Sequence, residues 1–308
     1  MQIVRGLESF PPDARPSVVA LGTFDGVHLG HRAILGTAVT HAREAGLQAL
    51  ACTFEQHPIE ILQPARAPRS ITTVEERLAL IAETGVDGVV VLSFTPELAA
   101  VEPEAFVKEV LLGRLRAQQI VVGFNHRFGR GARGDAGLLQ ELASRLGFQA
   151  HVVPPLTVGG VPVSSSEVRT ALQRGDVVAA ARFLGRPYAI GGTVTSGAGR
   201  GRTLGFPTAN LAPDGNLLIP RGVYGCLAHV DGVVHPTVVN IGVRPTFAET
   251  TLAIEAHLLD FTGDLYGRRM RLDFMLHLRE EMRFPSVEDL KAQIARDVEA
   301  ARVGLAAR

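Results

Sequence analysis

The first half of the chain alternates short apolar runs with longer stretches of helical character. The apolar runs are rich in Val, Ile, Leu and Ala and occupy residues 17–22, 49–54, 88–94, 119–123 and 149–153. The candidate helices between them lie at 30–46, 73–84, 102–113 and 135–146. Strands that are apolar throughout and separated by helices are typical of a parallel sheet covered on both faces. The pattern predicts an N-terminal, doubly wound, Rossmann-like α/β domain.

From residue 187 onward the pattern changes to strands and turns. Two short candidate helices precede it within 164–186, and runs rich in Val, Leu and aromatic residues then occupy 191–195, 222–229, 233–241, 252–259 and 269–277. Asp231-Gly232 is typical of a hairpin turn. A closing helix is indicated by Ser286 and Asp289, which have capping-box spacing. In a chain of 308 residues we expect two domains, 1–186 and 187–308, the second an antiparallel barrel with a C-terminal helix.

Composition argues against several classes of partner. Lys and Arg together number 31, as do Asp and Glu, so the formal net charge at pH 7 is 0. A neutral chain gives no support for broad binding to nucleic acid or to anionic membranes. The apolar stretches are too short to cross a bilayer and the start lacks a signal-peptide pattern, so we expect a cytoplasmic protein. Cys52 and Cys226 lie in apolar runs and are expected to be buried, reduced thiols.

The segment GTFDGVHLGH, residues 22–31, follows the first apolar run and leads into a helix. The start of a helix exposes unpaired backbone N–H groups that attract anions, and glycines allow a phosphate to approach closely. His28 and His31 are three residues apart, so both imidazoles project to one side of the turn. Histidines that are simply buried and hydrogen bonded are the alternative. We expect His28 and His31 to contact phosphates, with Gly22, Phe24 and Asp25 beside them.

Two further polar segments follow apolar runs, at the edge of the sheet where doubly wound folds bind ligands. TFEQHP holds His57, and GFNHRFGRGARGD holds Asn125, which can donate and accept, and Arg127, which can fork onto a phosphate. Phe124 or Phe128 can cover a flat ring. A loop with two packed aromatic residues is the plainer explanation of the same pattern.

Serine hydroxyls open the candidate helix that begins near residue 164. A serine at this position caps the helix. The same helix start, with Ser165, Ser166 and Arg169, also suits the β- and γ-phosphates of a nucleotide. The two roles are compatible.

The densest glycine stretch of the chain spans residues 197–210. A flexible hairpin connection is one explanation. Backbone N–H groups of such a loop can also surround a polyphosphate, and the side-chain oxygens of Thr208 and Asn210 suit a hard cation such as Mg²⁺. The expected nucleotide contacts of this loop are Gly199, Gly201, Gly205 and Pro207.

Glu255 alternates with apolar neighbours in the run 252–259. Alternation alone makes it a polar residue on the outer face of a half-buried strand. A kinase that acts on an alcohol needs a carboxylate near the hydroxyl, to orient it and accept its proton. Glu255 is a strand carboxylate able to do so.

At this point a family resemblance covers nearly the whole chain. GTFDGVHLGH, TFEQHP, GFNHRFGRGARGD and SSSEVR resemble, in order and spacing, the N-terminal module of bacterial bifunctional riboflavin kinase/FAD synthetases, within the His-x-Gly-His nucleotidyltransferases. GRGRTLGFPTANL, IPRGVYG, VVNIGVRPTF, IEAHLLDFTGDLYG and LREEMRF resemble the riboflavin kinase domain of that family. The resemblance implies a six-stranded antiparallel barrel, ATP as co-substrate, and riboflavin, FMN and FAD as substrates or products.

The resemblance also implies roles for the candidate residues of the kinase domain. Glu255 takes the position of the catalytic base, and Thr208 and Asn210 take the positions that bind Mg²⁺ and ATP. Arg279 and residues 280–284 fall where the family encloses the flavin. Phosphorylation of the ribityl 5′-hydroxyl of riboflavin is the implied reaction.

For the first domain the resemblance implies transfer of AMP from ATP to FMN, with loss of pyrophosphate and without a covalent enzyme intermediate. His28 and His31 would bind the ATP phosphates and stabilise the transition state, and Asn125 would hold substrate phosphate or metal. The leaving pyrophosphate would be held by Ser165, Ser166 and Arg169.

Two positions depart from the family pattern. His126 stands where an aromatic residue often follows the Asn, and Ser166 replaces a more usual Thr. An enzyme in which only the kinase is active is therefore one alternative, and a non-catalytic flavin or nucleotide sensor is another. The expected partners are small-molecule substrates, with no nucleic acid or membrane, and the expected state is a monomer or a weak homo-oligomer.

Overall fold

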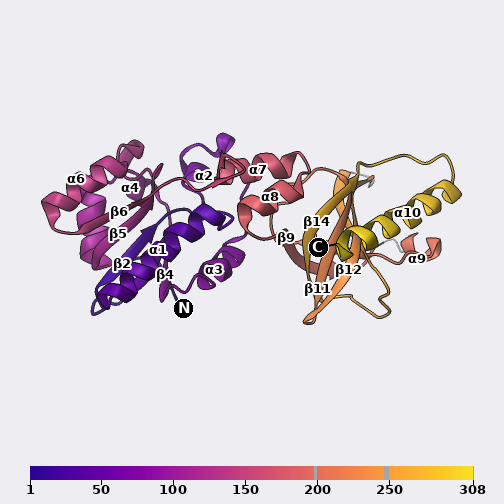
Figure 1. Cartoon of the computed structure of the whole chain (residues 1–308), viewed down its shortest axis with the longest axis horizontal. Coiled ribbons are helices and arrows are strands. Elements are labelled where there is room, and N and C mark those ends of the chain that lie inside the picture. The colour runs from indigo at the N-terminus through magenta and orange to yellow at the C-terminus, as the bar shows by residue number, and fades with distance from the viewer. Residues whose placement is uncertain (198–199, 246–249, 308) are drawn as a thin grey trace. The chain divides into compact units, whose positions relative to one another are not determined.

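The computed structural model describes residues 1–197, 200–245 and 250–307 (Figure 1). By their internal contacts, the residues form two compact units, Met1–Ser165 and Ser166–Arg308. The division falls at the start of helix α7 (Ser165–Gln173), so α7 and α8 (Val177–Leu184) group with the second unit. The domain boundary expected after residue 186 stays a prediction.

A sheet of six strands, each parallel to its neighbours, forms the centre of the first unit, in the order β1-β4-β3-β2-β5-β6. Its strands are β1 (Gln2–Arg5), β2 (Ser17–Leu21), β3 (Gln48–Phe54), β4 (Gly88–Leu92), β5 (Ala117–Gly123) and β6 (Gln149–Val153). The predicted doubly wound domain is confirmed. The strand order reverses beside β2, which lies between β3 and β5, and ligands of such sheets bind outside the carboxyl ends of the strands at the reversal.

Helices cover both faces of this sheet. The core on one face includes residues of α1 (Leu29–Ala45) and α3 (Val74–Ala82), and the core on the other includes residues of the π-type helix η2 (Phe106–Arg114) and α6 (Ala136–Leu146). Successive residues of β2 enter the two cores in turn, since side chains alternate along a strand. The central residues of these strands are therefore mostly apolar on both faces. The shorter elements are α2 (Pro58–Leu62), η1 (Pro64–Arg66), α4 (Pro96–Ala99), α5 (Pro103–Ala105), η3 (Arg130–Ala132), β7 (Thr157–Val158) and β8 (Val161–Pro162).

The second unit contains a closed barrel in the order β10-β13-β12-β11-β14-β9, with antiparallel neighbours. Its strands are β9 (Tyr188–Thr195), β10 (Ala209–Pro213), β11 (Gly222–Val230), β12 (Val233–Pro245), β13 (Thr250–Leu258) and β14 (Arg269–Arg279). The predicted barrel is confirmed. The predicted hairpin turn is also present, because Asp231 and Gly232 have φ values of 49° and 80° between the paired strands β11 and β12.

The second unit also contains helices outside the barrel strands. The predicted C-terminal helix is α10 (Val287–Ala306), which is capped by the Ser286 side chain and lies along the outside of the barrel (Figure 1). Ala301 of α10 packs with Val223 and Val238 in a small apolar cluster. Helix α8 contacts β9 and β14, and α9 (Arg200–Leu204) lies in the glycine-rich segment.

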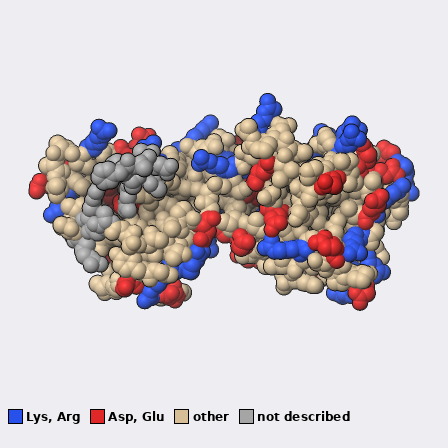
Figure 2. Space-filling view, turned by 180° about the vertical axis from the view of Figure 1, so that it is seen from behind, with Lys and Arg blue, Asp and Glu red and all other residues tan. Residues whose placement is uncertain are grey.

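The two cysteines and the surface charges agree with the sequence analysis. Cys52 and Cys226 are buried and free, and burial raises the pKa of the Cys52 thiol to about 12. Figure 2 shows Lys and Arg interspersed with Asp and Glu over the visible face, as a net charge of 0 predicts. Within the described ranges, every helix is too short or too polar to cross a membrane.

Candidate active sites

His28 and His31 lie together at the start of α1, at the carboxyl end of β2. His28 is the N-cap of the helix, and its Nδ1 accepts a hydrogen bond of 3.2 Å from the backbone N–H of His31. The two rings are stacked, with centroids 3.6 Å apart. An accepting Nδ1 assigns the proton of a neutral His28 ring to Nε2, which can donate to an anion. The structure thus brings both imidazoles to the helix start, where anions bind.

The loop that leads to these histidines has an unusual backbone. Phe24 and Val27 have φ values of 51° and 39°, in a region that bulky and β-branched residues rarely adopt. Both side chains are fully buried, and the Phe24 ring meets His31 edge-on at 5.4 Å between centroids. A Cβ at Gly22 would lie 2.9 Å from the Phe24 ring, so only glycine fits there. Such strain persists only where surrounding contacts hold the loop in place.

Asp25 supplies part of that hold. Its carboxylate accepts hydrogen bonds from the backbone N–H groups of Ile71 (2.9 Å) and Thr72 (3.3 Å). The Thr72 hydroxyl in turn accepts from the N–H of Gly26 at 3.2 Å, and Ser165 donates to the Asp25 carbonyl at 3.0 Å. Asp25, expected to contact the nucleotide, therefore lies where it shapes the loop.

The segment after β5 presents a different mixture of side chains. Asn125 and Phe124 are exposed, while Phe128 is buried in the core against Phe106, so Phe124 is the aromatic that can cover a ligand ring. Arg127 is exposed and pairs with Asp135 at 3.3 Å. The side chains of Asn125 and Arg127, which can both donate hydrogen bonds, therefore follow the carboxyl end of β5.

His126 packs parallel to the Phe128 ring, with centroids 6.0 Å apart. Its Nε2 is buried, and no hydrogen-bond partner for that atom lies among the described residues. Burial lowers the pKa of His126 to about 4, so the ring is neutral at pH 7. His126 thus packs here as an aromatic side chain does.

The remaining predicted residues of the first site lie on two helices. His57 is the N-cap of α2, where its Nδ1 accepts from the N–H of Ile59 at 3.2 Å. Ser166 and Arg169 lie on α7 and group with the second unit, so their placement beside the histidines remains a prediction.

In the barrel, Glu255 stands between two asparagines. It is paired with Asn210 of β10 on one side and with Asn240 of β12 on the other. Directly opposite residues of antiparallel strands point to the same face. All three are half-buried, whereas Ile254 and Ala256 point to the other face and are buried. The barrel therefore assembles an amide, a carboxylate and an amide in one row on its outer face, and Asn240 was not among the residues expected from the sequence.

The segment before β10 is held against the strand that carries Glu255. His257 Nδ1 lies 2.7 Å from the carbonyl oxygen of Pro207, and its ring meets Phe206 edge-on. A Cβ at Gly201 would lie 2.4 Å from the Phe206 carbonyl and 3.0 Å from the Thr208 hydroxyl, so the chain passes closely there. Thr208 and Asn210 are thus brought to the same edge as Glu255. Gly205 has a positive φ of 90°, and Gly199 lies outside the described residues.

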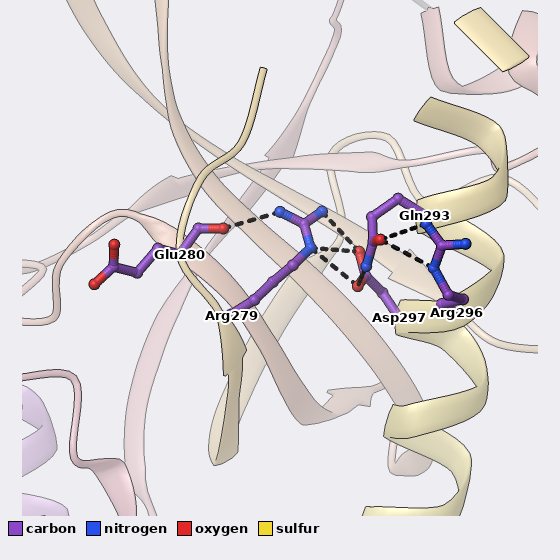
Figure 3. Close-up of polar contacts among 5 residues, drawn as sticks. All are labelled: Arg279, Glu280, Gln293, Arg296 and Asp297. Atoms are coloured by element: carbon purple, nitrogen blue, oxygen red, sulfur yellow. Dashed lines mark hydrogen bonds and ion pairs between the residues drawn. The ribbon is translucent and has the colours of Figure 1, made fainter. Parts of the chain in front are cut away.

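Arg279 lies at the end of β14, and its guanidinium faces α10 (Figure 3). It donates to both carboxylate oxygens of Asp297, at 2.7–3.1 Å, and to the carbonyl of Glu280 at 2.9 Å. Gln293 donates to the same carboxylate at 2.8 Å. This arrangement suits a residue that anchors segment 280–284, and the expected contact between Arg279 and a substrate stays a prediction.

The anchored segment reaches the row that contains Glu255. A Cβ at Gly242 would lie 2.4 Å from a carboxylate oxygen of Glu281 and 3.4 Å from the side-chain nitrogen of Asn240. Glu281 therefore lies over β12 beside the row. Its position supports the expectation that this segment encloses a ligand.

Comparisons with known proteins assign the two halves separately. A family model described as FAD synthetase matches residues 10–167, and one described as riboflavin kinase matches residues 184–305. The "bifunctional riboflavin kinase/FMN adenylyltransferase" of Escherichia coli K12 is 39% identical over 98% of this chain and 97% of its own length. The protein of the same name from Pseudomonas fluorescens is 41% identical over the same shares, and that of Bacillus subtilis is 38% identical over 91% and 90%.

A solved structure has the same fold. It is described as a macrolide-efflux protein from Streptococcus pneumoniae and matches with a TM-score of 0.88 and 28% identity, over 98% of this chain and 99% of its own. Its description is not shared by the curated relatives above, which agree with both family models. On that agreement, the chain belongs to the family of bifunctional riboflavin kinase/FMN adenylyltransferases.

Proposed function

We propose that this chain makes FAD from riboflavin in two ATP-dependent steps, one in each half. The match to both family models, in the order found in bifunctional relatives, carries the proposal. The barrel would phosphorylate riboflavin to FMN with release of ADP. The α/β unit would then join AMP from a second ATP to FMN and release pyrophosphate.

In the kinase step the ribityl 5′-hydroxyl oxygen attacks the γ-phosphorus of ATP, and the bond from that phosphorus to the β,γ-bridging oxygen breaks. We assign the hydroxyl proton to the Glu255 carboxylate. The flanking Asn210 and Asn240 restrict how the carboxylate can turn, because both stand directly opposite it in the sheet. A positioned base of this kind contributes about 10²–10⁴-fold to the rate.

The residues present fit a magnesium ion. Mg²⁺ prefers hard oxygen ligands and is usually held by one or two protein groups together with substrate phosphates. The Thr208 hydroxyl and the Asn210 side-chain oxygen offer such ligands at the edge where Gly201 lets the chain pass closely. When bound, the ion would neutralise charge on the β- and γ-phosphates.

In the adenylylation step a phosphate oxygen of FMN attacks the α-phosphorus of ATP, and the bond from that phosphorus to the α,β-bridging oxygen breaks. We assign His28 and His31 to the phosphates, where imidazole N–H groups and the start of α1 stabilise the negative charge that develops on the leaving pyrophosphate. Ser165, Ser166 and Arg169 are proposed to hold the pyrophosphate. Asn125 and Arg127 are proposed to hold the phosphate of FMN.

The proposal also covers the protein's ligands, its location in the cell and its oligomeric state. Its ligands are small molecules, since the balanced charge offers no broad basic surface for nucleic acid. We expect it in the cytoplasm, where its nucleotide substrates are made, and as a monomer or a weak homo-oligomer. Ultracentrifugation of the purified chain would measure the latter.

A time course from riboflavin and ATP that resolves FMN and FAD tests the two activities together. The Glu255→Ala variant should form no FMN but still convert supplied FMN into FAD. The His28→Ala variant should accumulate FMN and release little pyrophosphate.

The time course also separates the two alternatives. If the unmodified protein forms FMN but no FAD, the chain is an enzyme in which only the kinase is active. If it binds flavin but forms neither product, it is a non-catalytic sensor.

A further inference from the structure

A buried arginine lies beneath the loop that carries the two histidines. Arg77 projects from α3, and only 6% of it is exposed. Arginine is seldom buried unless it is paired. On α3 it occupies the inward face together with Leu78 and Ile81, which are core residues. Burial of this kind needs a compensating set of acceptors.

The acceptors are backbone carbonyls from two loops. Arg77 donates to the carbonyl of Thr23 at 3.1 Å, in the loop after β2. It also donates to the carbonyls of Phe54 and, at 3.3 Å, Glu55, where β3 ends. The Thr53 hydroxyl donates to the same Thr23 carbonyl at 2.9 Å. One guanidinium therefore ties together the carboxyl ends of two neighbouring strands.

The loop that Arg77 holds is the one in which Phe24 and Val27 have positive φ values. Thr23 immediately precedes Phe24, the first of the two residues with positive φ. Asp25 is bonded to the backbone of Ile71 and Thr72, the segment that precedes α3. The loop is thus fixed by α3 through Arg77 and by the approach to α3 through Asp25. A strained loop returns to ordinary φ values when such contacts are lost.

We infer that Arg77 is a positioning residue for adenylyl transfer, which acts through the loop that orients His28 and His31. The inference rests on the proposed role of the two histidines at the ATP phosphates. A displacement of about 1 Å in a catalytic group costs about a hundredfold in rate. Among the described residues, the hydrogen bonds of Arg77 go to main-chain carbonyls, so its influence on the histidines passes through the backbone of residues 23–28.

Three variants test the inference in the full-length protein. Arg77→Met removes all three bonds, and Arg77→Lys keeps the charge with fewer donors. Thr53→Val removes only the second bond to the Thr23 carbonyl and preserves the shape of the side chain. Arg43→Met is the control for loss of an arginine away from the histidines, because Arg43 is exposed and bonds the Asp87 carboxylate and the Gly85 carbonyl at the amino ends of the strands.

FAD formation from FMN and ATP is measured for each variant, and riboflavin phosphorylation by the same molecules is the internal reference. The expected fall in kcat for FAD formation is about a hundredfold in Arg77→Met and smaller in Arg77→Lys and Thr53→Val. Kinase kcat should not change. Arg43→Met should leave both rates unchanged.

A double-mutant cycle with His28→Ala separates positioning from a general loss of stability. If Arg77 acts through the histidine turn, the double variant should be hardly slower than His28→Ala alone, because residues that act as a unit are not additive. If the losses of the two single variants multiply in the double variant, the inference is overturned, while the assignment of the histidines stays intact. If His28→Ala forms FAD at the unmodified rate, the proposed role of the histidines is refuted instead. Should Arg77→Met fail to fold, unchanged kcat in both folded variants, Arg77→Lys and Thr53→Val, would refute the inference.

Discussion

Replacing Asp297 by Ala should destabilise the barrel far more than an ordinary surface ion pair would suggest. Asp297 accepts three bonds from Arg279 and one from Gln293, and its side chain is 6% exposed. Removing one partner of a buried pair costs about 3–5 kcal/mol because the other charge is left uncompensated. The Arg279 side chain is 18% exposed, so water can partly solvate the charge that is left behind. The expected loss of stability is therefore at the lower end of that range, about 3 kcal/mol.

The assay is thermal unfolding of the full chain, followed together with both activities. A loss of 1 kcal/mol lowers Tm by about 3 °C in a unit of this size, so the transition of the barrel should fall by about 9 °C. Because Arg279 also anchors segment 280–284, the KM for riboflavin should rise. Adenylylation of supplied FMN should not change, since the first unit contains none of these bonds.

Asp260→Ala provides the matched control. Asp260 also receives two short bonds from an arginine of α10, Arg302, at 2.7 Å each, but the pair is exposed, with side-chain fractions of 73% and 43%. Exposed pairs are screened by water and contribute little. Equal shifts of Tm in Asp260→Ala and Asp297→Ala would refute the argument from burial.

Three further predictions concern the two sites. Glu255→Gln should lower FMN formation by at least about a hundredfold and leave riboflavin binding within about threefold, as kinase kinetics and flavin fluorescence would report; unchanged turnover would exclude the base. His126 has a pKa of about 4 when folded, below the ordinary 6.5, so the unfolded chain binds more protons between these values and stability is lost as pH falls through that window, by about 2 kcal/mol at pH 5. His126→Phe should flatten the dependence of Tm on pH, and an unaltered pH profile would count against a neutral, buried ring. His257→Ala removes the contact to the Pro207 carbonyl and should raise the KM of the kinase for ATP several-fold, whereas an unchanged KM would show that the segment holds its place without it.

Much of the fold was predictable because its elements follow local patterns. The central residues of strands buried on both faces are mostly apolar, so the parallel sheet is visible in the sequence as Val, Ile and Ala runs. The hairpin at Asp231-Gly232 is determined by two residues that tolerate positive φ. Among the described strands, four escaped the pattern: β1 has a single buried residue, Val4, β7 and β8 have two residues each, and β10 is a short run inside the glycine-rich segment.

The site residues also fall into two groups, those with a local sequence signal and those without one. The His-x-Gly-His turn could be identified from neighbouring residues and predicted a phosphate site. Alternation placed Glu255 on the outer face of a strand, and its role as a base is implied by the family resemblance. Arg77 and Asn240 could not be identified from neighbouring residues, because nothing beside Arg77 in the chain marks it, and the opposition of Asn240 to Glu255 arises from strand register. The direction of Arg279 toward α10 has the same origin.

The sequence by itself therefore determined the two folds and their order, and it predicted candidate residues for each site, since all of these depend on short-range patterning. Tertiary structure alone decided which side chains hold a strained loop, which amides flank the carboxylate, and where a buried charge finds its partner. Those contacts join residues far apart in the chain, such as Arg77 with Thr23 and Arg279 with Asp297. Their partners are chosen by packing and register, which a local pattern does not contain.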